Sequence, residues 1–401
     1  MRWRRFGVAA LSTAMMLALS PAHTADLEPY QMMRSLQVVQ DRIANGDHAS
    51  MPMQRELLEI IDERLRAAGP ESFQETKNVN ALLIYGASGG NPATVETVFS
   101  NLDLEGEQQS LAQGILHYVR GNTGAARARL SQIDPFALDR EIAAPIALVT
   151  GSLLSGDLPE KALRLLDQAR LLSPGTLVEE AALRRTIALS ARIRDPERFA
   201  LATIQYVSRF LNSPYASQFA QDFVSAVALM HDEIEFHLIE EVADMMSDDR
   251  AFAIYLRIAR QSAIDGYDDL LAFASEKATT YASRIPEAGD DPRTVLYANI
   301  ASIKSNNIED VRQALGEIDP GRLSTEDKKL LEAARRVAES IIAPPSAQVV
   351  LADEIAERKQ PPNRAAGSGP EDDTTYFSEA YMAETQSRLD AVDALLKEDG
   401  R

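Results

Sequence analysis

The amino-acid sequence predicts an all-α protein, a right-handed α-solenoid built from antiparallel helix pairs. Apolar residues recur at the spacing of a helix face almost everywhere after residue 25. No set of alternating apolar and polar segments is present from which a sheet could be assembled. A unit consisting of a turn, a helix with small residues on one face and a proline recurs along the chain, as in helical-repeat proteins.

Residues 1–25 predict a secretory signal peptide. Three arginines among the first five residues form a basic start, and residues 6–19 are an uncharged, mostly apolar run. Cleavage after Ala22 and cleavage after Ala25 both remain open. Because the apolar run is shorter than the roughly 20 residues that span a bilayer, we expect cleavage, no membrane insertion of the mature chain, and location in the periplasm.

The first helices are marked by apolar stripes and by the turns that end them. One stripe lies within residues 36–43 and a second within residues 57–65. The strings NGD at 45–47, GP at 69–70 and SGGNP at 88–92 predict helix ends.

Four later units share a turn, a helix with small residues on one face, and a proline that ends the unit. The turns are GN at 121–122, GD at 156–157, DP at 195–196 and NN at 306–307, and the prolines are Pro135, Pro174, Pro214 and Pro320. The first three prolines are 39 and 40 residues apart, somewhat more than the tetratricopeptide period of about 34. Small residues let antiparallel helices approach closely. We therefore expect residues 26–342 to form one tetratricopeptide-like (TPR-like) array of about eight helix pairs.

The end of the array and the tail have their own signals. The string STED at residues 324–327 is a capping box that predicts a helix running to Ile342. Residues 343–375 are rich in Pro and Gly and predict a linker. Residues 376–401 predict a C-terminal amphipathic helix, which either docks back on the array or binds a partner.

Composition excludes several classes of function. Of 401 residues, 41 are Lys or Arg and 60 are Asp or Glu, which gives a net charge of −19. Such an acidic chain has little means of replacing counterions on nucleic acid or of binding an anionic membrane surface. The sequence has no cysteine, which excludes disulfides, thiolate metal sites and thiol nucleophiles.

Candidate catalytic and metal-binding strings are few, and each has a structural explanation. GASGG at residues 86–90 matches the G-x-S-x-G nucleophile elbow, which needs a strand before it. Residues 78–85 alone are compatible with a strand, but no partner strands exist, so we expect a loop between helices. His237 and Glu241 form an i, i+4 pair, but His231 is six residues from His237 and cannot share its helix face as a zinc pair does. DGYDD at 265–269 lacks the spacing of a Ca²⁺ loop and predicts a turn followed by acids at a helix N-terminus.

A lytic transglycosylase is the enzyme class that fits an exported helical superhelix best. Its catalytic Glu would lie in a lysozyme-like domain after the array. Glu339 precedes Ser340 as that class requires, but only 61 residues follow, which is too few for the domain. We expect no enzyme activity and no catalytic, cofactor or metal site, and the sequence identifies no partner-binding residue.

A series of short strings in a fixed order resembles one protein family. The strings are EPYQ at 28–31, RSLQ at 34–37, QDRI at 40–43, GDH at 46–48, MQ at 53–54, GN at 121–122 and LLSPG at 171–175. Together with the signal peptide they resemble the periplasmic flagellar-motor protein family MotC of the alpha-proteobacterial type, over residues 26–342.

The resemblance implies a protein that is required for flagellar rotation and binds the periplasmic domain of the stator protein MotB. It supplies no contact residues. The alternative is a general periplasmic scaffold, or a binder of cell-wall fragments, without a role in the motor. Both functions suit a helical array, because such arrays present extended surfaces for docking.

Overall fold

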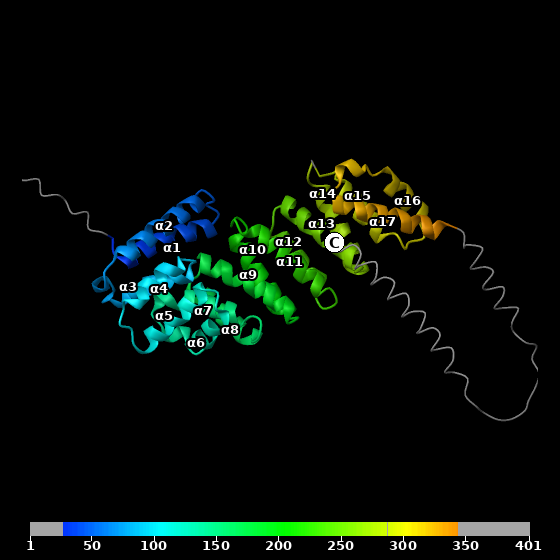
Figure 1. Cartoon of the computed structure of the whole chain (residues 1–401). Coiled ribbons are helices and arrows are strands. Elements are labelled where there is room, and N and C mark those ends of the chain that lie inside the picture. The colour runs from blue at the N-terminus through cyan, green and yellow to red at the C-terminus, as the bar shows by residue number, and fades with distance from the viewer. Residues whose placement is uncertain (1–26, 287, 344–401) are drawn as a thin grey trace, which may run out of the picture. The chain divides into compact units, whose positions relative to one another are not determined.

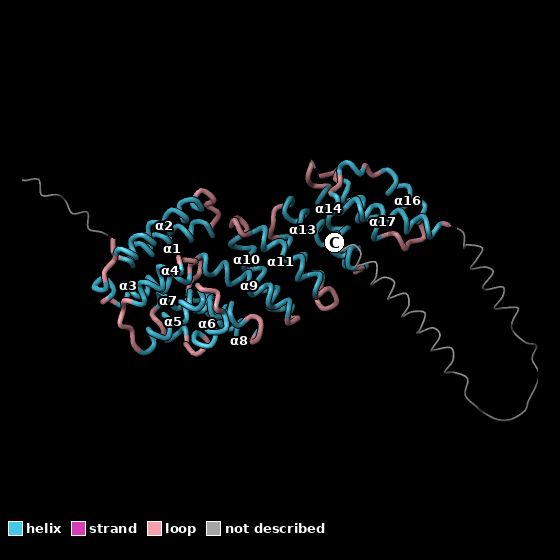
Figure 2. Tube along the Cα trace, in the orientation of Figure 1, coloured by secondary structure: helices cyan, strands magenta, loops and turns pink. Residues whose placement is uncertain are grey.

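The computed structural model describes residues 27–286 and 288–343, and every regular element in them is helical (Figure 1; Figure 2). The α-helices are α1 Pro29–Ala44, α2 Ser50–Ala67, α3 Thr76–Ala87, α4 Pro92–Ser100, α5 Gly106–Val119, α6 Thr123–Leu130, α7 Arg140–Leu154, α8 Pro159–Leu172, α9 Leu177–Arg192, α10 Pro196–Phe210, α11 Ala216–Leu229, α12 Phe236–Asp244, α13 Asp248–Asp265, α14 Asp268–Ala282, α15 Pro292–Ala301, α16 Ile308–Glu317 and α17 Thr325–Ile342. Short 3₁₀ helices lie at Pro70–Phe73 (η1), Pro135–Ala137 (η2) and Pro320–Arg322 (η3). The all-α prediction is confirmed, whereas the right-handedness of the array stays a prediction.

The predicted tail and signal peptide cannot be compared with this structure. Residues 1–25, all but the first residue of the linker 343–375, and the helix expected at 376–401 lie outside the described residues.

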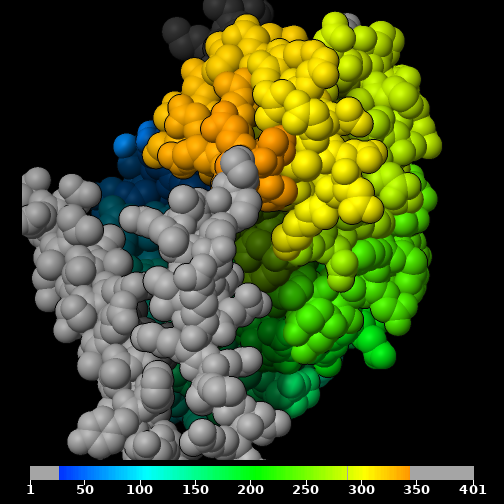
Figure 3. All heavy atoms as spheres, turned by 90° about the vertical axis from the view of Figure 1, so that its right-hand side faces the viewer, coloured from blue at the N-terminus to red at the C-terminus, as the bar shows by residue number. Residues whose placement is uncertain are grey.

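Odd-numbered and even-numbered helices play different parts in the packing. From α7 to α17, each odd-numbered helix contacts the next odd-numbered helix, so these helices form a continuous layer. Helices α2, α6, α8, α10 and α14 each pack against the odd-numbered helix that precedes them. This arrangement is a stack of helix pairs in which each pair buries its apolar face against the next. In Figure 3, the yellow and orange side chains of the last helices face the viewer at the end of the stack.

Burial follows the apolar stripes. Leu36, Ile43 and Leu65 are fully buried, and Ile61 is 1% exposed. One apolar cluster joins α1 to α7, a small one joins α7, α8 and α9, and the largest extends from α9 to α17 and includes Ala44 of α1. The core is therefore divided along the chain, as expected for an array of stacked units.

The turn predictions are mostly confirmed. Helices α1 and α2 end at Ala44 and Ala67, just before the NGD and GP strings. The Ser324 hydroxyl accepts a hydrogen bond from the Asp327 N–H at 3.1 Å, as the predicted cap of α17 requires.

In each of the four units the proline follows the end of the helix. Pro174, Pro320, Pro214 and Pro135 lie two, three, four and five residues after the ends of α8, α16, α10 and α6. Pro135 and Pro320 have a second role that was not predicted, because they open the 3₁₀ helices η2 and η3. Proline fits the first position of a helix because its missing N–H would have no partner there and its φ is already helical.

The N-terminal helix pair makes a contact that a simple stack does not contain. Helix α1 packs on α9, far along the chain. The Leu177 N–H, at the start of α9, donates a hydrogen bond to Asp41 Oδ1 at 3.3 Å, and Asn45 Nδ2 donates to the Gly175 carbonyl oxygen at 3.4 Å. The C-terminal part of α1 is thereby hydrogen-bonded to the start of α9.

Candidate docking grooves

The residues singled out in the sequence form turns. Gly86 and Ala87 end α3, and residues 88–90 form the turn before α4. Residues 78–85 lie inside α3, so their compatibility with a strand is not realised. The expected loop between helices is confirmed, and Ser88 has no sheet beneath it within the described residues.

The histidine and aspartate candidates are likewise structural. His237 Nδ1 lies 3.0 Å from Glu235 Oε2, and the partner that the spacing suggested, Glu241, makes no ion pair with it. The His231 ring stacks on Tyr267 with ring centroids 3.6 Å apart. Gly266 ends α13 with a φ of +78°, and α14 begins at Asp268, as predicted for the DGYDD string. Within residues 27–286 and 288–343, no three His, Asp or Glu side chains gather closely enough to hold a metal ion.

Buried carboxylates tie neighbouring helices together. Glu180 is fully buried, and its Oε1 accepts hydrogen bonds from Arg184 Nε at 2.8 Å and from the Tyr206 hydroxyl at 2.9 Å. Burial, together with the neighbouring Glu180 charge, raises the pKa of Tyr206. The phenol therefore stays protonated and serves as a permanent donor.

The same combination of carboxylate, tyrosine and arginine recurs twice. Asp62 accepts hydrogen bonds from Tyr85 and Arg66, and Asp327 accepts from Tyr297 at 2.8 Å and from Arg260 at 3.0 Å. Because every one of these carboxylates is already engaged between helices, the clusters are structural ties.

One groove lies between α1, α7 and α9 and has a volume of about 720 Å³. Its walls carry Arg34, Arg140, Arg184 and Arg185 against two acids, Asp41 and Glu141. Arg34 and Glu141 pair with each other at 3.1 Å. Arg185 belongs to the groove lining, where partial loss of hydration, followed by the adjacent Arg184 charge, lowers the pKa of its guanidinium.

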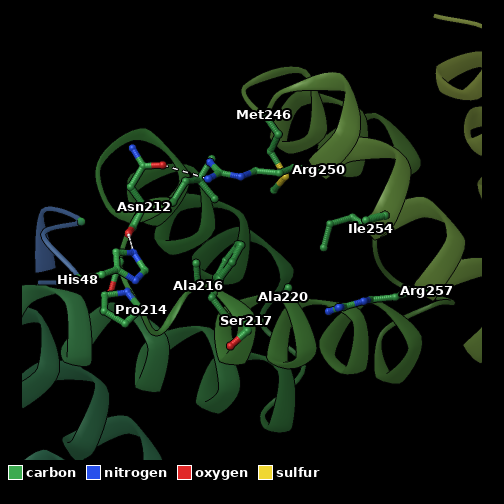
Figure 4. Close-up of a pocket in the computed structure, with 15 residues that line it drawn as sticks. His48, Asn212, Pro214, Ala216, Ser217, Ala220, Met246, Arg250, Ile254 and Arg257 are labelled. Atoms are coloured by element: carbon green, nitrogen blue, oxygen red, sulfur yellow. Dashed lines mark hydrogen bonds between the residues drawn. The ribbon is translucent and has the colours of Figure 1, made fainter. Parts of the chain in front are cut away.

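A second groove, shown in Figure 4, has a volume of about 590 Å³ and lies between α11, α13 and the loop that joins α10 to α11. At one end, a His48 ring nitrogen lies 2.9 Å from the Asn212 carbonyl oxygen, and Arg250 donates to Asn212 Oδ1 at 3.0 Å. Phe219 and Ile254 supply a buried apolar floor.

A third depression continues the second along the same two helices. It shares Ser217 and Arg257 with the second groove and adds mainly polar side chains, among them Gln218, Gln221 and Gln261. We call the combined surface the α11/α13 groove. Among the described residues that line it there is no Asp or Glu.

Sequence reasoning did not find these grooves. Their residues come from elements far apart in the chain: His48 lies in the turn before α2, whereas Arg250 lies on α13. The one local signal is the glycine at position 46, where φ is +95° and an added Cβ would lie 2.8 Å from Asn212 Cβ. No helix in the described part of the chain has the length and apolar character that a membrane span requires.

Comparison with known proteins gives one consistent result. The sequence matches the family model described as "Chemotaxis protein MotC" over residues 1–401. A relative of that name from Rhizobium meliloti (strain 1021) is 34% identical over an alignment of 429 positions, which includes 98% of this chain and 97% of the relative. No solved structure matches the chain.

Proposed function

Because the chain belongs to the MotC family of chemotaxis proteins, we propose that it is a non-catalytic periplasmic protein required for flagellar rotation. We further propose that it acts by binding the periplasmic domain of the stator protein MotB. The observation that carries the proposal is similarity along nearly the full length of a chemotaxis protein. The N-terminal basic and apolar pattern supports export.

The architecture supports a role in binding. A stack of helix pairs offers long grooves between neighbouring helices, and such surfaces suit protein segments. The buried carboxylates Glu180 and Asp327 are hydrogen-bonded between helices, which leaves them little freedom to exchange protons with a substrate.

A complemented clean deletion tests the role in motility. The expected result is cells that carry filaments by electron microscopy but do not swim, because torque generation is lost while assembly proceeds. Cells without filaments would instead indicate a role in assembly. Normal swimming with altered cell shape or wall composition would contradict the proposal and favour a general envelope scaffold or a binder of wall fragments.

Isothermal titration calorimetry tests the partner. The purified mature chain is titrated with the purified periplasmic domain of MotB from the same organism, and we expect saturable binding at micromolar concentrations. The cytoplasmic segment of MotB serves as the negative control. Absence of heat with the periplasmic domain, with both proteins folded, would rule out direct binding of this partner.

A further inference from the structure

The α11/α13 groove has a charge that is unusual for this protein. About one residue in seven of the chain is Asp or Glu, yet neither is found among the described residues of the lining. Three arginines and His48 contribute to it instead. The groove is therefore a basic tract on an acidic molecule.

Two facing helix stripes form the groove. On α13, Arg250, Ile254, Arg257 and Gln261 follow one another at intervals of three or four residues, which places them on one face. On α11, residues 216–225 contribute a matching stripe that includes Ala220. The rise of 1.5 Å per residue makes the α13 stripe about 17 Å long, enough for about three turns of a bound helix.

Apolar and basic groups are arranged in a way that suits an amphipathic ligand. Ile254 and Phe219 are buried and hold the floor in place, while Ala220, Met246 and Ala253 are half-buried or exposed and supply the apolar surface that a ligand can contact. Figure 4 shows Arg250 toward one end of the groove and Arg257 extending from α13 toward α11 at the other. An apolar floor flanked by cations matches a helix whose apolar stripe is flanked by carboxylates.

The arginines have bonding capacity left. Arg257 is exposed and has no carboxylate within ion-pair distance among the described residues. Within the same residues, Arg250 is bonded only to the neutral amide of Asn212. Arginine binds carboxylates through two parallel N–H···O bonds. Arg260 differs, because its guanidinium already pairs with Asp327 at 3.0 Å.

From these observations we propose that the α11/α13 groove binds an acidic amphipathic helix of a partner protein, with its apolar stripe over Ala220, Met246 and Ala253 and its carboxylates on Arg250 and Arg257. The rest of the surface favours this placement. A chain with a net charge of −19 repels acidic polypeptides over most of its surface. The α11/α13 groove differs from the groove between α1, α7 and α9 because no Asp or Glu stands beside the arginines in its described lining. This inference adds a docking place to the proposed function, but its occupant is defined by chemistry and does not depend on the identity of the stator.

The test measures fluorescence anisotropy of a labelled helical peptide with Leu at positions i and i+4 and Glu on both flanks. Titration with the full mature chain is expected to give saturable binding, which weakens between about 50 and 200 mM salt because the attraction is screened. The matched peptide with Gln in place of Glu is expected to bind at least about tenfold more weakly. Equal binding of the two peptides would overturn the charge complementarity.

Variants locate the site. Arg257→Gln removes an unpaired cation and is expected to weaken binding of the Glu peptide about tenfold. Arg164→Gln on α8 is the control, because Arg164 is also exposed and has no ion pair within the described residues. Ala253→Glu places an acid in the groove and is expected to abolish binding, whereas Thr280→Glu on α14 adds the same charge elsewhere and is expected to have little effect.

Hydrogen exchange provides the second measurement. The bound Glu peptide is expected to slow amide exchange in α11 and α13, and circular dichroism confirms that each variant is folded. Unchanged affinity of both Arg257→Gln and Ala253→Glu, or protection confined to other helices, would overturn the proposal. If the stator domain fails to bind while this peptide binds in the groove, the proposed partner is wrong and the docking surface still holds.

Discussion

The Tyr206 hydroxyl on α10 donates a hydrogen bond of 2.9 Å to Glu180 on α9, a carboxylate that is completely buried. The bond joins two helices of one pair across their interface. Because Glu180 Oε1 also accepts from Arg184 at 2.8 Å, the buried carboxylate has an opposite charge directly beside it. The tie from Tyr297 to Asp327 does the same between α15 and α17.

Removing the Tyr206 hydroxyl is expected to destabilise the array. Tyr206→Phe leaves Glu180 with one donor fewer in a buried setting, and a hydrogen bond to a charged group contributes about 1.5–3 kcal/mol. Urea denaturation followed by circular dichroism measures the loss. Tyr267→Phe is the control, since no hydrogen bond of its hydroxyl is found among the described residues. Equal stability of the two variants would show that the tie is unimportant.

Gly46→Ala is expected to loosen the N-terminal helix pair from the middle of the array. Position 46 has a φ of +95°, and the new Cβ would lie 2.8 Å from Asn212 Cβ and 3.0 Å from the Asn212 carbonyl oxygen. Gly266→Ala has the same kind of backbone strain, with a φ of +78°, but no atom within 4 Å. We expect about 1–2 kcal/mol of destabilisation for Gly266→Ala and about 1–3 kcal/mol more for Gly46→Ala. A smaller loss of stability in urea for Gly46→Ala than for Gly266→Ala would contradict the close approach of residue 46 to Asn212.

Alkaline pH is expected to destabilise the protein. Burial, followed by the hydrogen bond to Asp244 and its charge, raises the pKa of Tyr281 to about 12. A raised folded-state pKa favours the neutral phenol, so this stability is fully present below the unfolded value of about 10. It is lost as the pH rises from about 10 through 12. Urea midpoints measured across this range give the slope of stability against pH, and Tyr281→Phe should reduce that slope.

Asp41→Asn is expected to leave the protein equally stable or slightly more stable at neutral pH. Burial raises the pKa of Asp41, and the hydrogen bond from the Leu177 N–H offsets this only in part. A raised folded pKa means that the contribution of this group to stability is present below about 3.9 and is lost as the pH rises through the folded value. Asn keeps an oxygen that accepts the Leu177 N–H and removes the charge.

Asp41→Ala separates the two roles of that side chain. It removes the charge and the acceptor together, so the start of α9 loses a partner for one N–H and we expect a cost of about 0.5–2 kcal/mol. Thermal denaturation of Asp41→Asn and Asp41→Ala at neutral pH measures the two effects separately. A less stable Asn variant would mean that the ionised carboxylate is favourable at the start of α9.

Local signals predicted the helices well because they act over one or two turns. The stripe that contains Leu36 and Ile43 repeats every three or four residues, and both side chains are fully buried. Likewise, Ser324 caps α17 through an N–H only three residues away. Proline is a less specific signal: Pro135 and Pro320 follow the ends of α6 and α16 but also open η2 and η3, because proline fits the start of a helix as well as the segment after its end.

The sequence by itself determined the helical class, most helix ends and the resemblance to a family, since periodicity, caps and turn residues are properties of neighbouring positions. Only the tertiary structure decided that α1 packs on α9 and that His48 meets Asn212. It also decided that Arg250 meets Asn212 and that Arg257 extends toward α11, in a groove without Asp or Glu among its described lining residues. The physical reason is that such contacts depend on small rotations between successive helix pairs. These rotations accumulate along the array and leave no periodic pattern in any one helix.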